Sequence, residues 1–246
     1  MRGVSHFAIG VLAVVETSIL IDKPLSPLTF MISSFCSLLP DIDESHSTVS
    51  NLLIKSSFSK AIYRYTLYLI NMITFFILIY INKNLTFNFI LSFILIILIE
   101  NKLKHTTLRK SLFSALSFIL CLSLYYIKAP FAFISLAIFI GVAPWLKHRG
   151  FTHSLIGIIL LYFLLKEIEI LINCPQLALF SSISYASHIL LGDIFTKMGI
   201  PIFYPISNKK ISLAPFKVGS LSGNIFELVY TFVFFLIVIF TFKYKL

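Results

Sequence analysis

Histidine and aspartate side chains gather at the ends of apolar segments in this 246-residue chain, where ionisable groups are costly and therefore mark a functional site. Neutral imidazole and carboxylate are the ligands of zinc, manganese and non-haem iron. The three cysteines show no CxxC spacing, so a thiolate site is not expected. The candidate metal ligands are His6, Asp41, Asp43, His148, His153, His188 and Asp193.

These seven candidates exceed the needs of a single tetrahedral ion, so we expect two or three divalent ions, with zinc as the first choice. Two ions about 3.5–4 Å apart are the usual arrangement for cleaving a phosphoester, because they activate water and hold the leaving oxygen. An extended backbone after Pro40 would place the carboxylates of Asp41 and Asp43 on one side. The simpler alternative is that these carboxylates form ordinary ion pairs with Arg149.

The spacing of the other candidates requires helix ends rather than the sides of helices. The histidines at 148 and 153 lie five residues apart, and so do the candidates at 188 and 193. Five residues turn through about 500° on a helix, so each pair must lie across a helix end. For the first pair, Thr152 fits the N-cap of a helix that begins at His153.

The elements that must position these residues are membrane helices. The chain is 58% hydrophobic and 12% charged, with a mean hydropathy of +0.96, which excludes both an ordinary soluble domain and a disordered chain. We predict an all-α polytopic membrane bundle, a single integral membrane domain over residues 1–246 with about seven to nine transmembrane segments. The nine apolar segments are roughly 4–20, 25–40, 64–81, 85–100, 111–127, 130–146, 155–172, 177–191 and 225–242.

The net charge of +10 supports a particular orientation of these segments. If the N-terminus is cytoplasmic and all nine segments cross, most Lys and Arg residues lie on the cytoplasmic side, as the positive-inside rule requires. The excess of positive charge is then explained by topology, and no nucleic-acid partner is expected. In this orientation the candidate ligands all lie at cytoplasmic helix ends, whereas His46 and His105 are interpreted as solvated loop residues.

Four motifs carry a family resemblance: SHFAIG from residue 5, LLPDIDESHS from residue 38, KHRGFTHS from residue 147 and SHILLGDIFTKMGIPIFYP from residue 187. In this order they resemble the YdjM-like family of LexA-regulated, membrane-bound metal-dependent hydrolases. The resemblance implies an inner-membrane protein, more distantly similar to zinc-dependent phospholipase C and P1 nuclease. It implies that the seven candidates are the metal ligands, and that residues 64–127 form an additional helical insertion. Ser47, Arg149, Ser154 and Thr196 also match, whereas Glu44 stands where the family often has His or another polar residue.

Together these observations predict a membrane-bound hydrolase whose metal-activated water cleaves a phosphoester of a lipid or of a small, lipid-linked substrate. Asp41 and Asp43 are the candidates to receive the proton, and Arg149 is either a phosphate-binding catalytic residue or a topological charge. A membrane lipid is the expected partner, because it reaches a site at the membrane edge by lateral diffusion. The alternatives are a structural metal site, or a metal or proton transporter, although a transporter should carry its ionisable residues near mid-depth.

Overall fold

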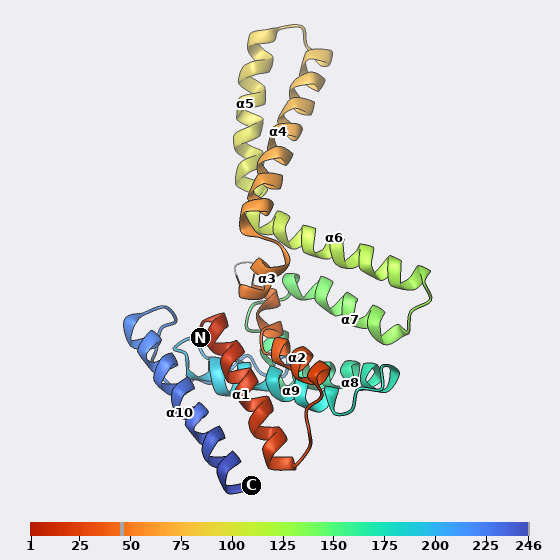
Figure 1. Cartoon of the computed structure of the whole chain (residues 1–246). Coiled ribbons are helices and arrows are strands. Elements are labelled where there is room, and N and C mark those ends of the chain that lie inside the picture. The colour runs from red at the N-terminus through yellow and green to blue at the C-terminus, as the bar shows by residue number, and fades with distance from the viewer. Residues whose placement is uncertain (45–46, 246) are drawn as a thin grey trace.

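The structure of the protein is a computed structural model that describes residues 1–44 and 47–245 (Figure 1). His46, interpreted from the sequence as a loop residue, lies outside this range. The regular elements of the described residues are helices, and apart from one isolated β-bridge between Ile200 and Ile211 these residues form no sheet, which confirms the predicted fold class. The helices are α1 (Gly3–Ile21), α2 (Pro27–Cys36), α3 (Thr48–Leu53), α4 (Ser56–Ile81), α5 (Leu85–Lys102), α6 (His105–Tyr126), α7 (Phe131–Val142), α8 (Leu155–Leu171), α9 (Leu177–Ser187) and α10 (Leu221–Lys245).

Six stretches of the described chain are long and apolar enough to cross a membrane: α1, α4, α5, α6, α10 and the stretch Leu177–Phe195 that begins with α9. The predicted number of seven to nine spans is therefore too high. The predicted segments 25–40 and 130–146 are interrupted where Pro40 and Pro144 enter short 3₁₀ turns, which leaves α2 with 10 residues and α7 with 12. The predicted segment 155–172 forms α8, which has 17 residues and is not among the six spans. A helix of ten residues is about 15 Å long, about half of the hydrocarbon core.

The centre of the fold is α9, which packs between α1, α2 and α8. Its stretch Leu177–Phe195 is the most buried of the six candidate spans. Small residues allow this close approach, because a Cβ at Gly10 of α1 would overlap Ser37 after α2 and Ser184 of α9. The positions at which α1, α2 and α9 begin and end are therefore fixed relative to one another.

The helices α4 and α5 form a long hairpin that extends away from the other helices, and α6 starts at its foot (Figure 1). The range 64–127 covers most of α4 and the whole of α5 and α6, and its origin as an insertion remains a prediction. Arg109 connects this region to the rest of the chain. Its buried guanidinium donates to the carbonyls of Ser50 and Ile54, at 2.8 and 2.6 Å, and so caps the last turn of α3.

Candidate metal centre

Four parts of the chain that are far apart in sequence bring the predicted ligands into one cluster. The first turn of α1 carries one ligand, the 3₁₀ turn Leu39–Asp43 carries two, the loop before α8 carries two, and the end of the α9 stretch carries two. Each member has a side-chain nitrogen or oxygen within 4 Å of such an atom of at least one other member. The prediction that these helix ends meet is therefore confirmed. The members are His6, Asp41, Asp43, His148, His153, His188 and Asp193.

Four of these residues, Asp41, His153, His188 and Asp193, form a group whose geometry suits one metal ion. The Nε2 atom of His153 lies 3.6 Å from Asp41 Oδ1 and 3.5 Å from Asp193 Oδ2. The Nε2 atom of His188 lies 3.5 Å and 3.9 Å from the same two oxygens. Tetrahedral ligation with bonds of about 2.0–2.2 Å places neighbouring ligand atoms about 3.3–3.6 Å apart, so small movements would seat an ion.

The hydrogen bonds of the two histidines leave their Nε2 atoms available to an ion. Nδ1 of His188 donates to the carbonyl of Ser37 at 2.6 Å, so its proton lies on the far side of the ring from the carboxylates. Nδ1 of His153 lies 3.1 Å from the hydroxyl of Thr152, which in turn donates to Asp43 at 2.6 Å. Both Nε2 atoms are buried and have no hydrogen-bond partner among the described residues. Outer hydrogen bonds that fix the imidazole in this way are typical of metal-binding histidines.

Asp43, His148 and His153 form a second, smaller group on the open side of the cluster. His148 Nδ1 donates to Asp43 Oδ1 at 2.8 Å, and His153 Nδ1 lies 3.5 Å from Asp43 Oδ2. The side chain of His148 is 33% exposed and that of Asp41 is 20% exposed, whereas the other side chains of the cluster are almost completely buried. The cluster is thus closed toward the protein and open beside these two residues.

Asp41 and Asp43 do not share one side of an extended strand, and that prediction was wrong. Residues 39–43 form a 3₁₀ turn, in which positions two apart are separated by about 240°. As a result Asp41 faces the four-residue group and Asp43 faces His148. One short turn thereby supplies a carboxylate to each group.

The predicted start of the helix after the KHRG motif was also wrong. The helix α8 begins at Leu155, and the hydroxyl of Ser154 accepts the N-cap hydrogen bond from the Gly157 amide at 3.3 Å. Thr152 is consequently free to bind Asp43, and its own carbonyl accepts a hydrogen bond from Tyr185 at 2.5 Å. Sequence reasoning missed the roles of Thr152 and Tyr185, because the side-chain partners of a short loop are set by its dihedral angles.

His6 lies beside the four-residue group rather than within it. Its ring stacks on that of His188, with centroids 3.6 Å apart, and its Nε2 lies 3.4 Å from Asp193 Oδ1. Gly192 makes this position possible, because a Cβ there would lie 2.5 Å from two atoms of the His6 ring. His6 therefore orients Asp193 and His188 in this arrangement, and direct ligation by His6 remains a prediction.

We expect Gly192→Ala to weaken divalent-ion binding about ten-fold or more, because outer partners of metal ligands typically contribute 10–100-fold in affinity. The added methyl group displaces the His6 ring from its stack on His188. Zinc titration of untagged protein against a competing chelator measures the effect. In a His6→Ala background the same substitution should cost little, because the ring that it displaces is gone. An equal loss in both backgrounds would contradict the steric explanation.

Arg149 is tied to the loop that carries Asp193. Its NH2 group lies 3.2 Å from Asp193 Oδ2, and NH1 donates to the Thr196 hydroxyl and the Gly199 carbonyl at 2.8 and 3.0 Å. The amino group of Met1 also lies 3.1 Å from Asp193 Oδ1. The alternative to metal binding was an ion pair between Arg149 and the carboxylates of Asp41 and Asp43. Arg149 instead pairs with Asp193. Phosphate binding by Arg149 remains a prediction.

The charges of the cluster shift the pKa values of its members outside the spanning segments. Burial alone would raise the pKa of Asp41, but the positive charge of His188 and the close imidazoles of His153 and His188 hold this pKa well below its usual range. Burial would also raise the pKa of Asp43, but the hydrogen bond from His148 and the nearby imidazole of His153 outweigh burial and lower this pKa. Burial favours neutral His153, yet Asp193, Asp41 and Asp43 raise its pKa well above 6.5. His153 therefore carries the positive charge that a metal ion would otherwise supply.

The fold and the site define a class: a helical, polytopic membrane protein with a His/Asp cluster where its helix ends meet. The chain belongs to the YdjM inner membrane protein family, whose sequence profile matches residues 1–245. This confirms the resemblance found in the four motifs and assigns the protein to the inner membrane. No curated protein and no solved structure matches the chain. The more distant similarity to phospholipase C and P1 nuclease remains a prediction.

Proposed function

We propose that the protein is a metal-dependent hydrolase of the membrane that cleaves a phosphoester of a lipid or lipid-linked substrate. The observation that carries this proposal is the group Asp41, His153, His188 and Asp193, with two buried Nε2 atoms that lack hydrogen-bond partners in the described chain. Two imidazoles and two carboxylates are a ligand set that zinc and related divalent ions accept. A bound ion would supply Lewis acidity and lower the pKa of water.

The residues of the open side provide the proton transfer that hydrolysis requires. His148 donates from Nδ1 to Asp43 at 2.8 Å, so its Nε2 is the atom that can accept a proton, which the partly exposed imidazole then passes to water. Asp43 stabilises the imidazolium that forms. Thr152 holds the other oxygen of Asp43 at 2.6 Å and fixes its orientation. Arg149, held beside Asp193, adds positive charge at the rear of the site, where a phosphate group would gain from it.

The openness of the cluster favours catalysis over a purely structural ion. Structural zinc sites are closed on all sides, whereas catalytic sites keep one position open to water or substrate. Asp41 and His148 are the two partly exposed members. The cluster also lies where apolar segments end, and a phospholipid presents its phosphate at that level of a membrane.

The test uses untagged protein loaded with zinc or manganese in detergent, assayed on phospholipids and on a soluble nitrophenyl phosphate. We expect release of the lipid headgroup, and a loss of about 100-fold or more in His148→Ala, the usual contribution of general acid–base catalysis. His105→Ala, which removes a histidine outside the cluster, is the matched control and should retain activity.

The outcomes separate the alternatives. Cleavage of the soluble ester without any cleavage of lipid would overturn the substrate class. Protein that binds the ion but hydrolyses neither ester would overturn the hydrolase proposal and support a structural ion, which should raise thermal stability on binding. Ion-dependent flux across proteoliposomes without hydrolysis would support a transporter.

A further inference from the structure

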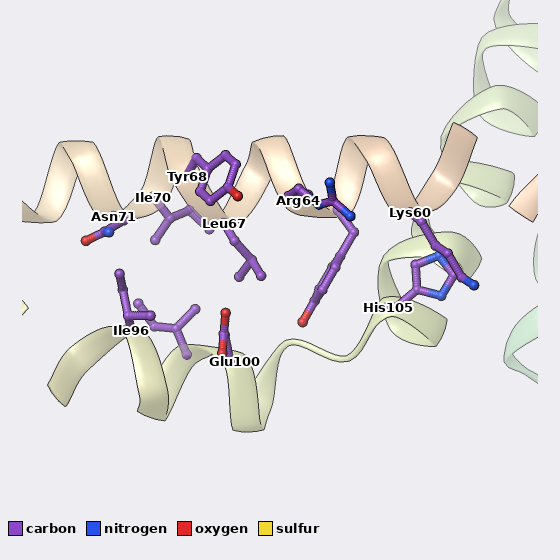
Figure 2. A pocket seen from close by; sticks show the side chains of 11 residues that line it. Lys60, Arg64, Leu67, Tyr68, Ile70, Asn71, Ile96, Glu100 and His105 are labelled. Carbon is purple, nitrogen blue, oxygen red and sulfur yellow. The ribbon is translucent and has the colours of Figure 1, made fainter. Parts of the chain in front are cut away.

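A cavity of about 530 Å³ lies between α4 and α5 at the foot of their hairpin, and none of its lining residues belongs to the metal centre (Figure 2). One end of the cavity is polar, with Lys60, Arg64 and His105. Beyond this end Leu67 of α4 lies across from Glu100 of α5, and further along, Ile70 and Asn71 lie across from Ile96. The cavity thus has a charged end and an apolar body.

The sequence of α4 explains why one end of the cavity is charged and the rest is mainly apolar. Lys60, Arg64, Leu67 and Asn71 follow at intervals of four, three and four residues, so they lie along one face of the helix, the face toward α5. In the described part of the chain neither Lys60 nor Arg64 forms an ion pair, whereas Lys166 does. Glu100 stands on the opposite wall, at the end of α5. Two cations and one carboxylate therefore line the cavity, and among the described residues none of the three forms an ion pair. The lining carries a net positive charge.

The polar end is held by contacts of its own. His105 is half-buried at the start of α6, and its Nε2 lies 3.0 Å from the Ser59 hydroxyl. Its ring meets that of Tyr63 edge-on at 5.8 Å, and Tyr63 donates to the Leu103 carbonyl at 2.7 Å. The expectation that His105 is a solvated loop residue was therefore wrong. These contacts fix the spacing of α4, α5 and α6 at the mouth of the cavity.

The outer faces of the hairpin show what surrounds it. Tyr65, Leu69, Ile73 and Phe76 of α4 and Phe93 of α5 are among its exposed apolar side chains, a surface that suits lipid chains. The positive charges gather at the foot, with Lys55, Lys102 and Lys104 beside the lining cations, and Lys83 stands at the opposite turn. The foot of the hairpin thus lies at the level of lipid headgroups, on the side with the greater positive charge.

We propose that this cavity binds an anionic phospholipid whose headgroup carries hydroxyl groups, such as phosphatidylglycerol. Its phosphate contacts Lys60 and Arg64, in charge-assisted hydrogen bonds that arginine makes especially well. Glu100 accepts hydrogen bonds from the headgroup hydroxyls, and one acyl chain lies along Leu67 and Ile96. Basic pockets between transmembrane helices are a recurring form of lipid recognition. This proposal is independent of hydrolysis at the metal centre.

The test compares binding of phosphatidylglycerol and phosphatidylcholine with identical acyl chains to delipidated protein in detergent, measured by native mass spectrometry. We expect phosphatidylglycerol to bind at least ten-fold more tightly, and the preference to decrease as salt rises. Lys60→Gln/Arg64→Gln should lose this preference. Lys209→Gln/Lys210→Gln removes the same charge from an exposed loop outside the cavity and should keep it.

Equal binding of the two lipids to the wild-type protein would overturn the proposal, whatever the variants do. An equal loss in both double variants would also overturn it, because it would show a response to net charge alone. Inorganic phosphate at millimolar concentration should not displace the lipid, and displacement would assign the cations to free phosphate instead. Unchanged helix content by circular dichroism and unchanged thermal unfolding of Lys60→Gln/Arg64→Gln show that the variant is folded.

Discussion

His153→Ala is expected to leave almost no divalent ion bound, because this histidine is the residue that both groups of the metal centre share. Its Nε2 faces Asp41 and Asp193, while its Nδ1 faces Asp43. Loss of an outer partner alone typically costs 10–100-fold in metal affinity, so removal of a ligand should cost more than about 100-fold. Plasma mass spectrometry of untagged protein, refilled with zinc and desalted, measures the bound ion per chain.

A second substitution makes the ion count informative. His148→Ala removes a ligand of the smaller group only, and should leave the ion of the four-residue group in place. If the wild-type protein holds two ions, His148→Ala should hold one and His153→Ala close to none. His105→Ala, outside both groups, should match the wild type. Wild-type stoichiometry in His153→Ala, with thermal unfolding unchanged, would contradict the assignment of the centre.

The sequence was sufficient to predict which residues meet, because polar side chains at membrane helix ends have few reasons to be there. His188 and Asp193 lie in or beside an apolar stretch that is mostly buried, and the helix end that their spacing demanded is present. The same reasoning placed His148 and His153 across a loop. For these two pairs, hydropathy and helix geometry are sufficient to place the residues at the ends of helices.

Sequence reasoning failed where short backbone segments decide the geometry. The carboxylates of residues 41 and 43 diverge because Leu39–Asp43 is a 3₁₀ turn, and an alternation of polar residues does not distinguish such a turn from an extended strand. Likewise, the Ser37 carbonyl orients His188, and a backbone group leaves no signal in residue type. Part of the excess of predicted spans has the same origin, because turns shorten α2 and α7, and the third segment that is not a span, α8, has only 17 residues.

The shape of the fold explains why the centre can be both buried and accessible. The helices α1, α2 and α9 converge on it and bury His6, His188 and Asp193, while the turns at Asp41 and His148 remain at the surface. Buried charged groups are stable only when groups of opposite charge lie beside them. When no ion is bound, His153, Arg149 and the amino group of Met1 provide that balance for the three carboxylates. A divalent ion would compete directly with the proton on His153.

The affinity for zinc or manganese is therefore expected to rise about ten-fold per pH unit between about pH 5.5 and 7. The pKa of His153 is raised well above 6.5, so in this window its imidazole is protonated, and binding of an ion to Nε2 must release one proton. The pKa values of Asp41 and Asp43 are lowered, so both carboxylates are already ionised in this pH window and do not add to the pH dependence of the affinity. Calorimetry in two buffers with different ionisation enthalpies should show about one proton released per ion.

The protonation of His153 also determines whether the stability of the ion-free protein rises or falls with pH. A histidine whose folded pKa is raised stabilises the fold below its unfolded pKa of about 6.5, and this contribution is lost as the pH rises through the folded value. The carboxylates stabilise above about pH 4, and their contribution is lost as the pH falls through their lowered folded values. Ion-free protein should then lose thermal stability on the alkaline side, and a bound ion should restore it by replacing the positive charge. An affinity that does not change with pH in this window, or a stability that rises on the alkaline side without ion, would show that His153 is neutral in the ion-free centre.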